Sequence, residues 1–175
     1  MKATDTRVRY TKDMLKKALL KITEIKNIDR ITVKELCEEA QINRGTFYLH
    51  YSTPNDVLIE IEDEMFEEIW VHLKEYTKDP TRIDVLQNVF KTILENKDVS
   101  RVLMGNNGNR KFIVRMKKQI RKEVVDQWCV ELPDLKKQNL DYVFDYVFDG
   151  STALIVDWMN NNTITIEQLS VRLDR

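Results

Sequence analysis

The stretch that decides the fold is residues 31–51, ITVKELCEEAQINRGTFYLHY. Thr32 and Glu35 have the spacing of a capping box, in which each side chain accepts a hydrogen bond from the other residue's backbone amide, so a helix should begin directly after Thr32. Asn43 is a favourable N-cap for a second helix over residues 44–50. The short connection between the two helices predicts that they cross at a steep angle, as in a helix-turn-helix unit.

The second helix carries side chains that suit a groove lined by phosphates. Arg44 and Thr46 lie in its first turn, where free backbone amides and the positive end of the helix dipole also favour anions. Gly45 allows a close approach of the helix to DNA, and Tyr48 and His50 can donate hydrogen bonds to phosphate oxygens. Such units also occur purely as packing elements, but this set of side chains favours binding of double-stranded DNA in the major groove.

Residues 31–33, 37–40 and 44–51 carry a resemblance to a known family, and the run 45–51 is its most specific part. In these residues the chain resembles the DNA-binding domain of the TetR family of bacterial transcription regulators. The resemblance covers about residues 8–60. It implies an all-α fold and a dimer that binds DNA.

Two positions depart from the family pattern. Gln41 stands where the family usually has glycine, at a turn that favours a positive φ. Pro54 stands where the family usually has a lysine that contacts phosphate, so one phosphate contact is in question. The residues predicted to lie at the DNA, either on the second helix or at the start of the helix before it, are Thr32, Val33, Arg44, Gly45, Thr46, Tyr48 and His50.

The amino-acid composition limits the folds and the classes of function that are expected for this chain. The chain has 175 residues, 42% of them apolar and 33% charged, with four glycines and three prolines, which favours long helices over a turn-rich sheet fold. No apolar run approaches the ~18 residues of a membrane span and the N-terminus lacks the core of a signal peptide, so we expect a cytoplasmic protein without membrane partners. Two isolated cysteines and two histidines predict no metal site and no cofactor. No nucleophile–base pair is apparent, so we do not expect an enzyme.

Charge is distributed unevenly along the chain. Residues 1–50 hold 11 Lys and Arg against 7 Asp and Glu, whereas the remainder holds 17 against 22. Cationic side chains supply most of the non-specific affinity for DNA, so the basic front end agrees with the helix-turn-helix prediction. Its excess is modest, which favours a dimer that doubles the contact area.

Hydrophobic periodicity predicts an all-α chain of about nine helices. We expect a DNA-binding helix-turn-helix domain of three helices over residues 1–53 and a helical regulatory and dimerisation domain over 54–175. Residues 1–10 are expected to be loose, with Arg7 and Arg9 free to reach DNA. The first helix should run from about 11 to 26 and bury Leu15, Ala18, Leu19, Ile22 and Ile25. Further helices are expected at 54–77, 82–96, 99–104, 110–130, from 132 to about 159, and from 165 onwards.

The last long helix is apolar on two sides, which predicts that one side faces a second copy of the chain. Small side chains would allow close approach there, and the expected interface residues are Tyr142, Tyr146, Gly150 and Ala153. The same helix carries a row of like charges, Asp141, Asp145 and Asp149. We expect this row either to be solvated or to pair with a basic stripe formed by Lys111, Arg115, Lys118 and Lys122.

A ligand pocket in the C-terminal part is predicted from large side chains at helical spacing, although ordinary core residues have the same pattern. The candidate lining residues are Trp70, Phe90, Met104, Phe112, Met116, Trp128 and Tyr146. The runs 102–105 and 107–108, with the long last helix, also resemble the C-terminal part of some TetR-like regulators, including the subgroup related to dihydroxyacetone-kinase operon regulators.

The function expected from these features is a homodimeric, ligand-responsive repressor that binds a palindromic operator through the helix at 44–50. The alternative is a TetR-like co-regulator that acts mainly by binding another protein, an idea motivated by Pro54 and by the modest basic charge.

Overall fold

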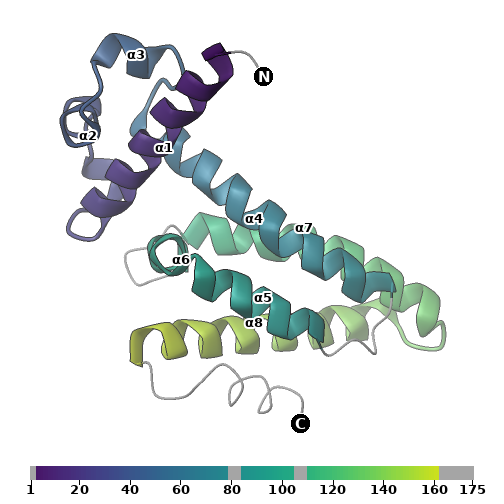
Figure 1. Cartoon of the computed structure of the whole chain (residues 1–175). Coiled ribbons are helices and arrows are strands. Elements are labelled where there is room, and N and C mark those ends of the chain that lie inside the picture. The colour runs from purple at the N-terminus through teal and green to yellow at the C-terminus, as the bar shows by residue number, and fades with distance from the viewer. Residues whose placement is uncertain (1–2, 79–83, 105–109, 162–175) are drawn as a thin grey trace. The chain divides into compact units, whose positions relative to one another are not determined.

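A computed structural model describes residues 3–78, 84–104 and 110–161 (Figure 1). Within these ranges the chain forms eight α-helices, one 3-10 helix and no strand, which confirms the all-α prediction. The helix expected from residue 165 lies outside the described residues. The elements are α1 (Ala3–Thr23), the 3-10 helix η1 (Ile28–Arg30), α2 (Val33–Ala40), α3 (Arg44–Tyr48), α4 (Pro54–Lys78), α5 (Asp84–Glu95), α6 (Lys97–Met104), α7 (Arg110–Glu131) and α8 (Lys137–Asn161).

The chain divides into two compact units, Met1–Met65 and Phe66–Arg175, which we name the head and the body. Both include part of α4, because the division after Met65 falls within that helix, and the domain boundary predicted after residue 53 stays a prediction. The roles predicted for the two domains remain predictions. Within the described ranges, no helix combines the length and the apolar character needed to cross a membrane.

The first helix differs from its prediction at both ends. It begins at Ala3, so the expectation of a loose segment is wrong for residues 3–10. It ends at Thr23, whose hydroxyl donates to the carbonyl oxygens of Leu19 at 3.0 Å and Leu20 at 2.7 Å. Ile25 therefore lies beyond the helix and is 89% exposed, and its predicted place in the core is wrong. The prediction rested on hydrophobic periodicity alone, which continues past Thr23 although the helix ends there.

The core of the head forms where α1 packs against α2, and α2 against α3 (Figure 1). The predicted inward residues Leu15, Ala18 and Leu19 of α1 are buried. They share this core with residues from the other three helices of the head: Leu36, Cys37, Ala40, Phe47, Val57, Leu58 and Ile61. All four helices of the head thus contribute buried side chains to one common core.

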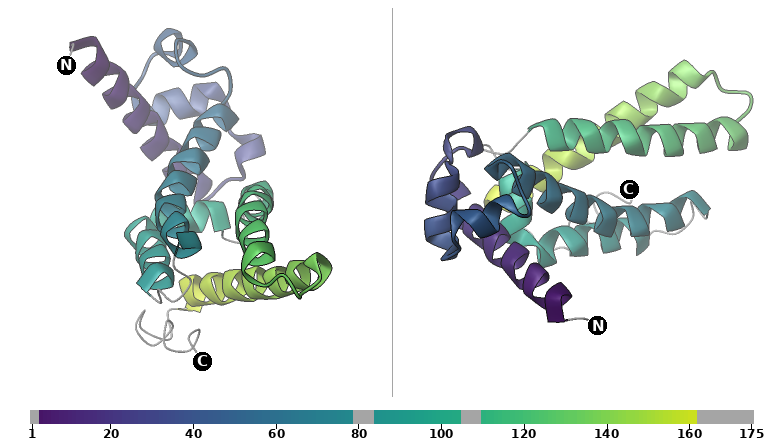
Figure 2. Two further views of the ribbon diagram at one scale, coloured as in Figure 1. Left: turned by 90° about the vertical axis from the view of Figure 1, so that its right-hand side faces the viewer. Right: turned by 90° about the horizontal axis from the view of Figure 1, so that it is seen from above.

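The body is built around α7 and α8, two long helices that pack against each other and are joined by residues 132–136 (Figure 2). The last helix begins at Lys137, five residues later than predicted, and Leu132 and Leu135 are exposed in the connection. Buried side chains from several helices form the core of the body, among them Ile69, Ile93, Leu103, Phe112, Ile120, Val125, Phe144 and Trp158.

Candidate nucleic-acid interface

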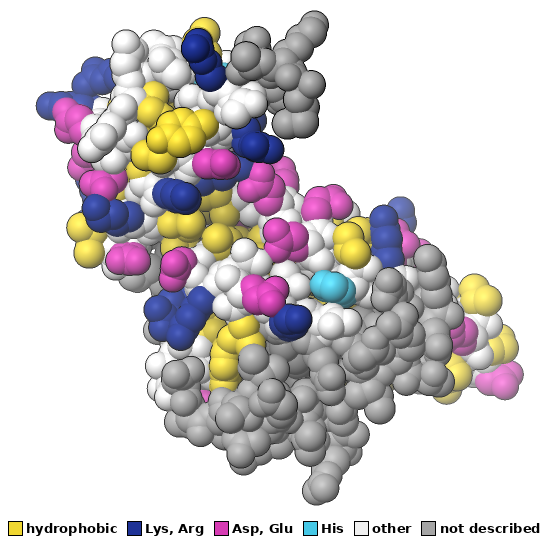
Figure 3. Space-filling view, in the orientation of Figure 1, with side chains coloured by type: hydrophobic (Ala, Val, Ile, Leu, Met, Phe, Trp, Pro, Cys, Tyr) yellow, Lys and Arg dark blue, Asp and Glu magenta, His cyan; other side chains and the backbone are white. Residues whose placement is uncertain are grey.

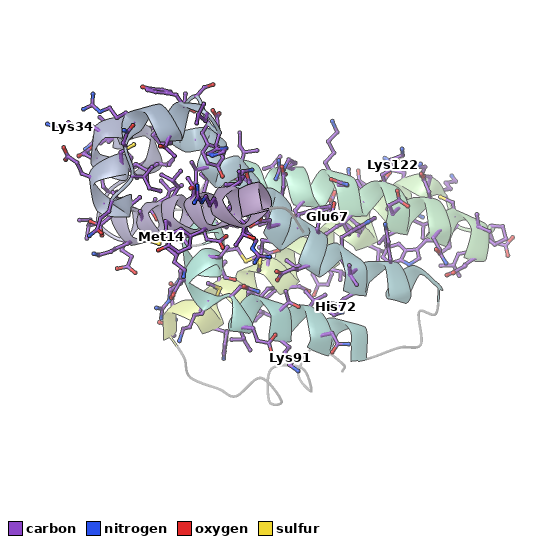
Figure 4. All side chains as sticks on the ribbon, turned by 45° about the horizontal axis from the view of Figure 1, so that its top comes forward. Met14, Lys34, Glu67, His72, Lys91 and Lys122 are labelled. Carbon is purple, nitrogen blue, oxygen red and sulfur yellow. The ribbon has the colours of Figure 1, made fainter. Side chains whose placement is uncertain are left out.

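The start of α2 is fixed by the predicted capping box. The hydroxyl of Thr32 accepts from the amide of Glu35 at 3.2 Å, and the carboxylate of Glu35 accepts from the amide of Thr32 at 2.9 Å. Lys26 adds an ion pair to the same carboxylate at 2.6 Å. The Lys26 contact and the two bonds from Thr32 lower the pKa of Glu35 to about 2. The box holds Thr32 exposed and Val33 half-buried at the beginning of α2, and Lys34 beside them is exposed (Figure 4).

The turn between α2 and α3 depends on Gln41, which has φ 56° and ψ 38°. It is the only non-glycine residue with a positive φ in the described part of the chain. Its amide bonds to the carbonyl oxygen of Glu38 at 3.3 Å, and the amide of Ile42 bonds to that of Cys37 at 2.9 Å. These bonds close the end of α2 in the left-handed conformation that usually calls for glycine. Gln41, which stands where the family usually has glycine, therefore adopts this conformation with backbone strain.

The start of α3 is capped by Asn43, as predicted. Its side-chain oxygen Oδ1 accepts from the amides of Gly45 at 2.6 Å and Thr46 at 3.4 Å. A Cβ atom added to Gly45 would lie 3.0 Å from the same Oδ1. The absence of a side chain at Gly45 therefore makes room for the capping side chain of Asn43. This role of Gly45 was not predicted from the sequence.

The exposed face of α3 brings together three of the predicted residues, Arg44, Gly45 and Tyr48. The helix ends at Tyr48, two residues earlier than predicted, and His50 lies in the turn that follows. Thr46 and His50 are half-buried, so they lie at the side of this face. Phe47 points the opposite way and is fully buried in the core. One buried ring thus anchors a helix whose other face is open to solvent.

Leu49 extends this exposed face and was not among the predicted residues. Its side chain is 78% exposed and follows Tyr48, which is 59% exposed. The signal that could have identified it is its spacing of four residues from Gly45, which places both residues on one side of a helical path.

The exit from α3 is held by a group of polar side chains that we name the head cluster: Lys12, Lys16, Tyr51, Glu60 and Glu64. The hydroxyl of Tyr51 donates to Glu60 at 3.0 Å, and Lys12 and Lys16 each pair with that carboxylate at 2.8 Å. Lys16 also pairs with Glu64 at 2.5 Å. Sequence reasoning missed this cluster, which joins α1 and α4 to the residue that follows the helix-turn-helix unit.

Electrostatics favours the charged form of Glu60. Burial alone would raise its pKa, but the bonds from Lys12, Lys16 and Tyr51 outweigh burial and lower the pKa to about 2. The pKa of Tyr51 is raised by burial and by Glu60, so its hydroxyl stays protonated and remains a donor. The cluster therefore keeps one ionised carboxylate between two cations and a phenol.

The start of α4 at Pro54 agrees with the prediction. The carboxylate of Asp56 accepts from the amides of Ser52 at 2.8 Å and Thr53 at 2.9 Å, and these bonds lower its pKa. Further along α4, acidic side chains follow one another on its exposed side (Figure 3). Such a face would be repelled by DNA phosphates.

The body contains an apolar cavity of about 180 Å³. Met104, Met116 and Trp128 of the predicted set line it, and Ser151 and Thr152 are its polar lining residues. Trp70 and Phe112 are buried but are not part of its wall, and Tyr146 is 82% exposed and lies outside it. The side chain of Phe90 lies outside the described residues. The use of this cavity for a ligand remains a prediction.

Two cations of α7 pair with three carboxylates of α8, and we name these five residues the body ladder: Lys117, Arg121, Asp141, Asp145 and Asp149. Lys117 lies 2.9 Å from Asp145 and 2.7 Å from Asp149. Arg121 also pairs with Asp145 and lies 3.6 Å from Asp141. Lys117 and then Arg121 lower the pKa of Asp145.

The partners that the structure describes for the aspartate row, Lys117 and Arg121, are not members of the predicted stripe, and the side chain of its first member, Lys111, lies outside the described residues. Lys117 and Arg121 are four residues apart, so their spacing matches that of the aspartates across the helix pair. Arg115, Lys118 and Lys122 of the predicted stripe are exposed, and Figure 4 marks Lys122 on α7. Among the described residues, no group of three or more acidic, histidine or cysteine side chains is placed to hold a metal ion.

The ladder borders the cavity. Lys117 Nζ lies 5.9 Å from the ring centre of Phe148, and the guanidinium of Arg121 lies 5.9 Å from that of Phe144. Both rings line the cavity. The cations are thus engaged outside the apolar wall, and none of the described residues that line the cavity is charged.

The residues predicted to form a dimer interface are exposed on α8. They are Tyr142, Tyr146, Gly150 and Ala153, and Val143 and Val147 next to them are also exposed. An apolar helical face of this kind is available to a second chain, and the dimer remains a prediction.

Comparison with known proteins agrees with this architecture. A family model named TetR_C_8, described as a transcriptional regulator C-terminal region, matches residues 81–175, which is more than half of the chain. A segment of 53 residues, 30% of the chain, is 34% identical to the uncharacterized HTH-type transcriptional regulator YxbF of Bacillus subtilis (strain 168). That segment corresponds to only 14% of the length of YxbF.

Solved structures share the fold over nearly the whole chain. A TetR transcriptional regulator from Streptococcus agalactiae 2603V has a TM-score of 0.69 at 20% identity, covering 97% of this chain and 94% of that one. A TerR/AcrR family regulator from Aquifex aeolicus VF5 has a TM-score of 0.71 at 14% identity, covering 93% and 95%. The resemblance to the dihydroxyacetone-kinase subgroup stays a prediction. The family match, together with the helix-turn-helix and helical body described above, shows that this chain belongs to the TetR family of transcriptional regulators.

Proposed function

We propose that this regulator is a cytoplasmic homodimeric repressor that binds a palindromic operator through α3 and leaves it when a small apolar effector occupies the body. The observation that carries the proposal is the exposed face of α3, where Arg44, Gly45 and Tyr48 lie together on a helix anchored by Phe47. A short helix held in this way fits the major groove, and Thr32 at the start of α2 is exposed for a backbone contact.

Dimerisation is part of the proposal because a single head carries only a modest basic charge. The exposed face of α8 supplies an apolar surface with small residues at Gly150 and Ala153, which would permit close packing of two helices. Two copies would present two α3 helices to successive major grooves, about 34–36 Å apart. The operator would then have two related half-sites.

The cavity supports an effector that is uncharged. In the described part of the chain, its lining is apolar except for two hydroxyl side chains and includes no charged residue. A charged ligand would lose its hydration there without gaining a partner, which costs several kcal/mol. A cavity of about 180 Å³ is comparable to apolar cavities of ~150 Å³ that bind benzene. The effector we propose is therefore a neutral molecule of about the size of one ring.

The first experiment measures binding of the purified protein to the DNA that flanks its own coding region, at low and moderate salt. We expect specific binding that weakens as salt rises, because phosphate contacts release counterions. Tyr48→Ala should abolish specific binding. Tyr10→Ala removes the same kind of exposed side chain from α1 and should leave the specificity unchanged.

A second experiment tests the effector with two matched ligands. Benzyl alcohol and benzoate share one ring and differ in charge at neutral pH. We expect benzyl alcohol to raise the melting temperature and to release the operator, whereas benzoate should do neither. Equal effects of the two ligands would contradict the proposed effector class without affecting the operator result.

The alternative is a co-regulator that binds another protein, and Pro54 at the place of a phosphate-binding lysine favours it. A folded dimer that shows no sequence-specific DNA binding would support this alternative over the repressor.

A further inference from the structure

Leu49 is a large apolar side chain on the surface that the proposed function assigns to DNA. It is 78% exposed, and its backbone, with φ −72° and ψ −19°, continues the helical path of α3 by one residue. Its amide bonds to the carbonyl oxygen of Thr46 at 3.3 Å, which fixes this turn. The direction of the Leu49 side chain is therefore set by the helix and not by a free loop.

The neighbours of Leu49 give it no place in the core. Phe47 occupies the buried side of α3, and Thr46 and His50 flank it. A helical side chain covers the turn that precedes its own Cα, and the residue there is Gly45, which has no side chain to pack against. The Leu49 side chain is thus apolar and exposed, next to Tyr48 in the chain and one turn after Gly45.

The chemistry of the major groove offers one apolar group that fits this position. Phosphates and most base edges are polar, and the polar side chains of α3 can satisfy them. The 5-methyl group of thymine is the apolar feature of the groove, and apolar side chains recognise it. We propose that Leu49 is a specificity-determining residue that contacts the 5-methyl group of a thymine in each operator half-site. This inference rests on the proposed binding of α3 in the major groove.

The test begins with an operator, obtained by selecting bound sequences from random duplex DNA with the full-length protein. Each thymine of the operator is then replaced by deoxyuridine, which pairs identically but lacks the methyl group. At one thymine of a half-site we expect the affinity to fall about fourfold, which corresponds to ~0.8 kcal/mol for one group of CH₂ size. Replacement at the other thymines should have less effect.

Substitutions of Leu49 test the same contact from the protein side. Leu49→Ala should bind the thymine operator more weakly than the wild type and should no longer distinguish uracil from thymine at that position. Leu49→Met retains an apolar chain and should keep the distinction. Ile25→Ala is a matched control, because it removes an apolar side chain that is 89% exposed in the joint between α1 and α2. It should keep both affinity and discrimination.

The outcomes separate this inference from the function on which it rests. If random duplexes yield no preferred sequence, the proposed function is refuted and the role of Leu49 is refuted with it. If an operator is found but uracil is tolerated at every thymine, or Leu49→Ala still discriminates, only the role of Leu49 is refuted. In that case Leu49 does not recognise the 5-methyl group of thymine.

Discussion

The head cluster and the body ladder are two ionic networks of similar size that differ in their surroundings. Each contains five side chains and joins two long helices, α1 to α4 in the head and α7 to α8 in the body. In the head cluster, Tyr51 is buried and the side chain of Lys16 is only 12% exposed. In the body ladder, the side chain of Lys117 is 25% exposed, that of Asp145 35% and that of Asp149 63%. The head cluster is thus the more buried of the two, through Lys16 and Tyr51.

Burial decides how much such a network fixes the structure. Exposed ion pairs typically contribute ~0–1 kcal/mol, because water and salt screen them and ordering the side chains costs entropy. A pair that is partly removed from water gains more, and breaking it leaves a charge without compensation. We therefore infer that the head cluster fixes the position of Tyr51 and, with it, the end of the helix-turn-helix unit. The body ladder adds little to the stability of α7 and α8, because apolar packing already holds these two helices together.

Glu60→Gln should have the largest effect, because it removes the carboxylate that three partners share. We expect the head to lose about 2 kcal/mol of stability, less than for a fully buried pair since Glu60 retains contact with water. Hydrogen exchange of the α1 amides in the full-length protein measures this loss. Unchanged exchange would show that the head cluster is as weak as a surface pair.

Acid should weaken the head through the same residue. The pKa of Glu60 is about 2 in the folded protein against an ordinary value of 4.5. Its contribution is therefore complete above pH ~4.5 and is lost as the pH falls toward 2. The α1 amides should lose protection over this range, and Glu60→Gln should make the loss shallower. Parallel curves for the two proteins would argue against Glu60 as a source of the acid sensitivity.

Tyr51→Phe sharpens the comparison, because it removes only the hydroxyl and leaves the buried ring. We expect a loss of ~1 kcal/mol, the usual net value of one hydrogen bond. Urea unfolding followed by the exchange of head amides is a suitable measurement. Tyr10→Phe, at an exposed tyrosine of α1, is the control and should be neutral.

Asp145→Asn should have the smallest effect, although Asp145 contacts both cations of the body ladder. The side chains of Lys117 and Asp145 are 25% and 35% exposed, so water screens their pair more than it screens Lys16 and the buried Tyr51, and the change in stability should be smaller than that of Tyr51→Phe. It should shrink further at 1 M salt, where the screening length is ~3 Å. A large effect that persists in high salt would show that the ladder is shielded from solvent and would remove the contrast with the head.

The parts of the head that could be predicted from sequence are those fixed by neighbours in the chain. Thr32 with Glu35, and Asn43 with the amides of α3, are bonded within a few residues, so their spacing is sufficient. The helices of the body could also be located from their periodicity, apart from shifts at their ends.

The missed features depend on partners that are distant in sequence. Tyr51 precedes α4 and bonds to Glu60 nine residues later on that helix, and the two lysines that pair with Glu60 come from α1. The described partners of the α8 aspartates, Lys117 and Arg121, were not predicted, because spacing gives the face of each helix but not the rotation of one helix against another. Leu49 was missed because the residues of this helix were selected for contact with phosphate, a criterion that an apolar side chain does not meet.

The cavity in the body has a consequence for the response of the protein to hydrostatic pressure. The cavity of about 180 Å³ is partly open to the surface, and the volume change of unfolding scales with the dry part of such space that unfolding eliminates. Compression therefore favours opening of the body, where this volume is stored. An effector that fills the void would remove that advantage, so occupancy of the cavity would be measurable as a resistance to pressure even for a ligand that forms no hydrogen bond.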